Sequence, residues 1–170
     1  AAIQIAQYLG AKHIIATTRS NRKTASLKQL GATEVICTTD ANWPVTVKEI
    51  TGGINVVIDQ VGGELFADCL KTMALKGRYV TVGRNAGRDA KLNLDLLARQ
   101  QLALIGVTFR TRTQSEALAC STRFAQDLLP AFDAGLLQPV VDKTFTLEDL
   151  SQAHRYMQSD QQIGKIVLVT

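Results

Sequence analysis

Short apolar segments alternate with helical segments along the first two thirds of the sequence. The apolar segments are followed in turn by stretches of helical periodicity or by glycine turns, and they lie at residues 13–17, 34–37, 55–59, 78–82 and 102–109. A nearly continuous apolar strand is typical of a parallel sheet that helices cover on both faces. The connections between such strands are right-handed crossovers. The sequence therefore predicts an α/β fold with a doubly wound, Rossmann-type parallel sheet.

The pattern changes after Phe109. A long helical pattern covers residues 115–137, a strand pattern follows at 140–145, and a last strand is predicted at 164–169. Between these strands, Thr146 and Asp149 have the spacing of a capping box, which predicts a helix that begins directly after Thr146. We therefore predict two parts, a Rossmann-type nucleotide-binding domain at 1–137 and a C-terminal helix–strand segment at 138–170.

Composition excludes several classes of function. Of the 170 residues, 46% are hydrophobic and 20% charged, which is typical of a folded domain. The net charge of +4 is small and no run of basic residues exceeds Arg22–Lys23, so nucleic-acid binding gains little support. No apolar run approaches the roughly 20 residues that span a bilayer. Three separated cysteines without a CxxC pair suit a reducing compartment, so we expect a cytoplasmic protein with neither membrane nor nucleic-acid partners.

The first ten residues already have the pattern of a helix interior. Ile3, Ala6 and Leu9 recur at helical spacing, Gly10 ends the pattern, and neither a capping residue nor an initiating Met precedes it. We therefore expect the sequence to be an excerpt of a longer polypeptide.

A basic loop follows the first predicted strand. In doubly wound sheets, ligands bind beyond the carboxyl ends of the strands, and folds that prefer NAD carry an acidic residue there for the ribose hydroxyls. The segment 17–23 (TTRSNRK) has three basic residues and no acid. Arg and Lys attract a 2′-phosphate, which an acid would repel. The alternative is an ordinary solvated helix start.

Glycines and one acid follow the later strands. Gly62 and Gly63, and separately Gly83, would let a ligand approach the backbone, although each also suits an ordinary turn. Asp59 lies at a strand end, where its carboxylate is expected to accept hydrogen bonds from neighbouring backbone amides rather than to act in catalysis.

Taken in order, these segments resemble the cofactor-binding half of the medium-chain dehydrogenase/reductase superfamily, specifically its zinc-independent quinone oxidoreductase branch. The match runs over essentially the whole chain, and its last part, 140–157, resembles the segment that re-enters the family's catalytic domain. The residues that carry the resemblance are 1–6 (AAIQIA), 30–32 (LGA), 50–53 (ITGG), 57–63 (VIDQVGG), 77–80 (GRYV) and 163–167 (IGKIV).

The resemblance has consequences for the fold. It implies that the family's first strand and glycine-rich turn would precede Ala1. In the strand order 3-2-1-4-5-6 that strand is the central one, so the remaining strands would form two half-sheets with facing unpaired edges. The strand from Leu102 to Phe109 resembles the family's edge strand, which implies a homodimer formed through it.

The resemblance also implies a set of NADPH contacts. Lys23 stands where the family has a lysine on the 2′-phosphate, Thr18 where NAD-dependent relatives have the acid, and Thr38 where many relatives have Tyr. Asp160 stands where relatives can carry Arg or Asn. The implied cofactor-binding residues are Thr18, Arg19, Ser20, Lys23, Thr38, Val61, Val82, Gly83, Arg84 and Phe109.

The implied activity is hydride transfer from NADPH to a quinone or an α,β-unsaturated carbonyl, without a metal and without an acid or base supplied by this chain. Two alternatives stay open: the cofactor-binding part of a zinc-dependent alcohol dehydrogenase, and a non-catalytic protein that keeps the fold for dinucleotide binding or dimerisation. The NADPH interpretation requires Arg19 and Lys23 to face the cofactor pocket and to be free of ion pairs elsewhere.

Overall fold

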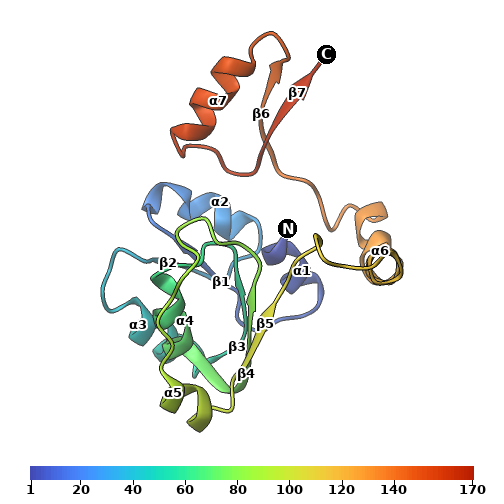
Figure 1. Cartoon of the computed structure of the whole chain (residues 1–170). Coiled ribbons are helices and arrows are strands. Elements are labelled where there is room, and N and C mark those ends of the chain that lie inside the picture. Colours follow the sequence, from blue (N-terminus) through green and yellow to red (C-terminus); the bar gives the residue numbers. More distant parts are fainter.

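The computed structural model describes residues 1–170 and confirms an α/β fold built from parallel strands (Figure 1). Every strand pair is parallel. The elements run in the order α1 (Ala2–Tyr8), β1 (Ile15–Thr18), the 3₁₀ turn η1 (Asn21–Lys23), α2 (Thr24–Gln29), β2 (Glu34–Cys37), α3 (Trp43–Thr51), β3 (Ile54–Asp59), α4 (Leu65–Thr72), β4 (Met73–Thr81), α5 (Leu94–Arg99), β5 (Ala103–Gly106), α6 (Gln114–Asp133), β6 (Val141–Thr146), α7 (Leu150–Gln158) and β7 (Lys165–Val169).

The strands of the Rossmann-type region form two separate sheets, as predicted for a doubly wound sheet without its central strand. One sheet is β1–β2 and the other is β3–β4–β5. Because β1 and β3 are end strands of different sheets, each has one edge without a strand partner. On β3, Val56 and Ile58 are 40% and 46% exposed, so the apolar face that suits a buried parallel strand is only partly covered.

The core of the larger sheet lies between β4 and α4. Leu70, Met73, Tyr79 and Leu102 are its buried members. The Phe66 ring meets the Tyr79 ring edge-on, with centroids 5.0 Å apart and an interplanar angle of 77°. This packing fixes α4 against the strand that carries Tyr79.

Two strand boundaries differ from the prediction. The helix before β4 ends at Thr72 and the strand begins at Met73, with a register shift against β3 and a left-handed Lys76 (φ 59°) before the predicted segment. The edge strand predicted at 102–109 is shorter, because β4, its only partner, ends at Thr81. The last ladder bond is from the Val107 amide to the Thr81 carbonyl, at 3.2 Å.

The predicted capping box is wrong. Thr146 is the last residue of β6 and α7 begins four residues later at Leu150, with Asp149 at its N-cap and no side-chain cap bond. The Thr146 hydroxyl bonds Asp149 directly at 3.2 Å. The capping box of this chain is at Thr113 and Glu116, where it begins α6.

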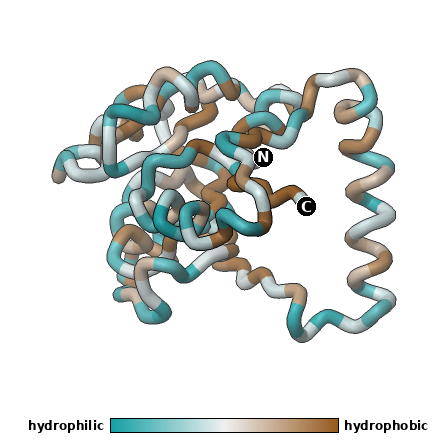
Figure 2. The backbone as a smooth tube through the Cα atoms, turned by 90° about the horizontal axis from the view of Figure 1, so that it is seen from above, coloured by the Kyte–Doolittle hydropathy of each residue, from teal (hydrophilic) through white to brown (hydrophobic).

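The C-terminal residues form a unit of their own, in which α7 packs on the two-stranded sheet β6–β7 (Figure 1). Helix α6 connects it to the larger sheet and stands apart from the rest of the chain, with hydrophobic and hydrophilic residues along its length (Figure 2). Its Leu118 and Phe124 are 66% and 46% exposed. No helix in this structure combines the length and the hydrophobicity needed to span a lipid bilayer.

Candidate functional site

The loops after β1 and β2 are joined by hydrogen bonds. The Thr18 hydroxyl accepts from the Ser20 amide at 3.2 Å, and the Thr18 carbonyl accepts from the Thr38 amide at 2.8 Å. Ser20 is the N-cap of η1 and its hydroxyl accepts from the Arg22 amide at 3.4 Å. Three of the predicted cofactor residues, Thr18, Ser20 and Thr38, therefore lie together at the carboxyl ends of two paired strands.

The side chains of Arg19 and Lys23 extend from this loop to the same carboxylate. The Arg19 guanidinium lies 2.7 Å from Asp160 Oδ2, and Lys23 Nζ lies 3.3 Å from Oδ1 of the same residue. Hydrogen bonds from Arg19 and from Lys23 hold the pKa of Asp160 below its usual range. The requirement that both cations be free of ion pairs is therefore not met, because a residue from the α7–β7 connection is bound to both.

A second group of predicted residues surrounds Asp59 at the end of β3. The Asp59 carboxylate accepts from the Val61 amide at 2.8 Å and from the Gly62 amide at 3.0 Å, which confirms the predicted backbone role. The buried Tyr79 hydroxyl also donates to this carboxylate. Burial and the hydrogen bond to Asp59 raise the pKa of Tyr79, so its phenol stays protonated and remains a donor. Tyr79 could not be identified as a site residue from the sequence, because it lies in an apolar strand pattern that is typical of core residues.

Glycine at 83 lets the β4 loop pass close to the β3 loop. The amides of Val82 and Gly83 both donate to the Asp59 carbonyl, at 2.7 and 3.1 Å. A Cβ atom at Gly83 would lie 2.1 Å from the Gln60 carbonyl oxygen, far inside contact distance. The small residue is therefore needed for backbone packing, which is the turn interpretation of this glycine.

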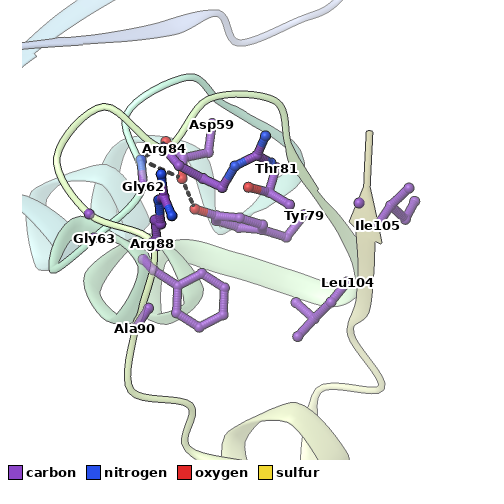
Figure 3. Close-up of a pocket in the computed structure, with 13 residues that line it drawn as sticks. Asp59, Gly62, Gly63, Tyr79, Thr81, Arg84, Arg88, Ala90, Leu104 and Ile105 are labelled. Carbon is purple, nitrogen blue, oxygen red and sulfur yellow. Dashed lines mark hydrogen bonds between the residues drawn. The ribbon is translucent and has the colours of Figure 1, made fainter. Parts of the chain in front are cut away.

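A cavity of about 290 Å³ lies between these loops and β5 (Figure 3). Asp59 and Tyr79 form part of its wall, and Arg84 and Arg88 also line it. Arg84 was predicted at this site, whereas Arg88 was not, because nothing in its turn-rich sequence context distinguishes it from a solvated arginine. Phe109 belongs to neither group: its ring is 64% exposed and stacks under Arg112, whose Cζ lies 4.8 Å from the ring centroid.

Comparison with known proteins decides the family. The model of the family described as "Zinc-binding dehydrogenase" matches residues 30–168, well over half of the chain. The chain belongs to the zinc-binding dehydrogenase family. Two oxidoreductases of known sequence resemble it over nearly its whole length: quinone oxidoreductase-like protein 2 of Bos taurus, 28% identical over 99% of this chain and 48% of the relative, and acryloyl-coenzyme A reductase of Sulfurisphaera tokodaii, 27% identical over 98% of this chain and 46% of the relative.

A solved structure shows the same fold. The quinone oxidoreductase of Thermus thermophilus, which was also determined in complex with NADPH, superposes with a TM-score of 0.85 at 28% identity. The match covers 100% of this chain and 53% of that protein. This chain spans about half the length of the relatives it matches, and it corresponds to their C-terminal, cofactor-binding part, as the order of segments predicted.

The residues of this dehydrogenase chain fit a nicotinamide dinucleotide. Arg19 and Lys23 already hold an anionic oxygen group at 2.7 and 3.3 Å, and the loop that carries them has no acid. The same residues offer no comparable place for a metal, since no group of three or more His, Cys, Asp or Glu residues that could hold an ion is found in the structure. The prediction that the whole protein works without zinc stays a prediction.

Proposed function

We propose that this chain binds NADPH, and that the protein containing it transfers a hydride from NADPH to a quinone or another α,β-unsaturated carbonyl compound. One observation carries the choice of NADPH: the loop after β1 has no acid and carries Arg19 and Lys23 at the carboxyl end of that strand. The relatives support the reaction class, because one is named a quinone oxidoreductase-like protein and another an acryloyl-coenzyme A reductase.

The contacts to Asp160 do not prevent this role. The side chains of Arg19 and Asp160 are 76% and 58% exposed. An ion pair this exposed contributes only about 0–1 kcal/mol. A phosphate monoester carries a charge of roughly −1.5 to −2 near pH 7, more than one carboxylate. The Lys23 side chain is 21% exposed against 76% for Arg19, so solvent and salt screen its contacts less, and it is expected to make the stronger of the two phosphate contacts.

The other predicted residues would line the remainder of the cofactor. Val61, Val82, Gly83 and Arg84 lie at the ends of β3 and β4, where ligands bind in doubly wound sheets. Asp59 and Tyr79 position the Val61–Gly62 turn by the hydrogen bonds described above. Bound NADPH supplies the hydride, so this chain has to hold and orient the cofactor and exclude water from it. No side chain of this chain is assigned as acid or base.

We also propose that residues 1–137 are the cofactor domain, that residues 138–170 return to a catalytic domain, and that β5 pairs with a second copy. β5 has β4 on one side only, and its Leu104 and Ile105 are each 40% exposed. Replacing Ile105 with Lys places a charge on that edge and should convert a dimer of the full-length protein to a monomer in size-exclusion chromatography. An unchanged elution volume would argue against this contact.

Titration of the full-length protein with NADPH and NADH tests the cofactor assignment. Lys23→Ala should weaken the binding of NADPH by about 1–3 kcal/mol through loss of a charge-assisted contact and leave the binding of NADH unchanged. Lys28→Ala is the matched control, because Lys28 lies on α2 and pairs with Glu34 instead. Equal affinity for both cofactors would refute the role of Lys23. Oxidation of NADPH by quinones and enones, followed by absorbance, tests the reaction itself, and tight binding without turnover would favour a non-catalytic protein.

A further inference from the structure

We propose that Asp160 acts as an internal competitor for the adenosine 2′-phosphate and thereby sets how strongly this protein prefers NADPH over NADH. This inference rests on the proposed function, since it assigns a specificity-determining residue to the same site. It differs in sign from the role of Arg19 and Lys23, because Asp160 would weaken binding of the phosphorylated cofactor.

The pattern of ion pairs points to Asp160. Four of the six ion pairs in the structure join residues at most six positions apart in the sequence. The other two span 141 and 137 positions, and both end on the Asp160 carboxylate. One oxygen of this carboxylate faces Arg19 and the other faces Lys23. This two-point contact is the one that a phosphate bound between the same cations would make.

A second acid near Lys23, Asp142, is hydrogen-bonded to other residues. Its oxygens accept hydrogen bonds from the Tyr156 hydroxyl at 2.7 Å and from the Ile163 amide at 3.1 Å. Hydrogen bonds from the Tyr156 hydroxyl and the Ile163 amide lower the pKa of the Asp142 carboxyl, and the charge of Lys23 adds a smaller contribution. Asp142 therefore holds the C-terminal unit together, whereas Asp160 makes its side-chain contacts only to Arg19 and Lys23.

Asp160 lowers the positive charge that a 2′-phosphate would meet at Arg19 and Lys23. Arg19 and Lys23 carry two positive charges and Asp160 removes one of them. A 2′-phosphate would then meet a site of net charge +1 and a carboxylate at the position that its own oxygens need. The phosphate and the carboxylate are both negative and repel each other, so the carboxylate must leave the cations before the phosphate can bind both Arg19 and Lys23. NADH has no 2′-phosphate and would bind without this exchange.

Asp160→Asn is the variant that tests the proposal. Asp160 has a left-handed backbone conformation, with φ 53°, and Asn tolerates this conformation well. The substitution therefore removes the charge and keeps the local fold. Glu34→Gln is the matched control, because it also removes one acid from an exposed ion pair, here with Lys28.

The full-length protein is titrated by calorimetry with two probes, adenosine 2′,5′-bisphosphate and 5′-AMP, which differ only in the 2′-phosphate. Asp160→Asn should tighten binding of the bisphosphate by about 10-fold, from the loss of two exposed contacts and a repulsion, and change 5′-AMP by less than about 2-fold. The gain should shrink as salt rises from about 0.05 to about 0.5 M. Glu34→Gln should change neither affinity.

The outcomes separate the two proposals. If the wild-type protein prefers the bisphosphate through Lys23 but Asp160→Asn does not increase that preference, the competitor role is wrong and the NADPH assignment stands. If the preference exists only in Asp160→Asn, the competitor role is correct and the natural protein is not NADPH-specific. If neither protein shows a preference, both fail. Weaker binding of 5′-AMP by Asp160→Asn would make Asp160 a ribose ligand, which overturns the competitor role.

Discussion

The two ends of the proposed cofactor site are held by different forces. At the ends of β3 and β4, a buried carboxylate, Asp59, binds a buried tyrosine and two backbone amides. At the ends of β1 and β2, two exposed ion pairs bring Arg19 and Lys23 to Asp160. Buried, fully satisfied networks fix geometry, whereas exposed ion pairs contribute little and exchange partners easily. One end of the proposed site is therefore held by a buried network, whereas the other is held by contacts weak enough for the anion exchange that we propose.

The largest effect is expected from Asp59→Ala, which breaks the rigid end. The substitution leaves the Tyr79 hydroxyl and the amides of Val61 and Gly62 without their acceptor, in a region where Asp59 is only 7% exposed. We expect the free energy of unfolding to fall by about 3 kcal/mol, measured by urea denaturation of the full-length protein. Asp160→Asn, at the other end, should lower it by less than about 1 kcal/mol. If both variants lost the same free energy of unfolding, the two ends of the site would not differ in rigidity.

Two cysteines report on the two ends separately. Burial raises the pKa of Cys69, on α4, to about 12, whereas hydrogen bonds with Thr39 lower the pKa of Cys37, on β2. The thiolate is the reactive form, so a raised pKa slows alkylation at a given pH. At about pH 8, iodoacetamide should modify Cys37 more than about 100-fold faster than Cys69, as followed by peptide mass spectrometry. In urea the two rates should converge, and similar rates in the folded protein would show that the environment of Cys69 is not closed.

A smaller effect is expected from Gly83→Ala. The added methyl group would meet the Gln60 carbonyl oxygen at 2.1 Å and force the two loops apart, at a cost of about 1–3 kcal/mol in unfolding free energy. Gly106→Ala is the matched control, since a Cβ atom there meets nothing within 4 Å. If both variants unfold at the same urea concentration, the close approach of the β3 and β4 loops does not contribute to the rigidity of this end.

The sequence predicted the parts of this molecule that depend on local pattern. The apolar strands, the α/β class and the backbone role of Asp59 follow from periodicity and from residue type at a strand end. The limits of the edge strand could not be predicted, because β5 ends where its partner β4 ends at Thr81. Nor could the contact of Asp160 with Arg19, since 141 positions separate them and only the tertiary fold brings the α7–β7 connection to the basic loop.

The most direct test of the proposed function is the titration of the 2′-phosphate of bound NADP⁺, followed by phosphorus NMR. A phosphate monoester ionises for the second time near pH 6, and adjacent cations favour the dianion. On the full-length protein, we expect the pKa of the bound phosphate to lie below that of free NADP⁺ and to rise toward it in Lys23→Ala. A bound phosphate that titrates like free NADP⁺, with or without Lys23, would contradict the central claim that the loop after β1 binds it.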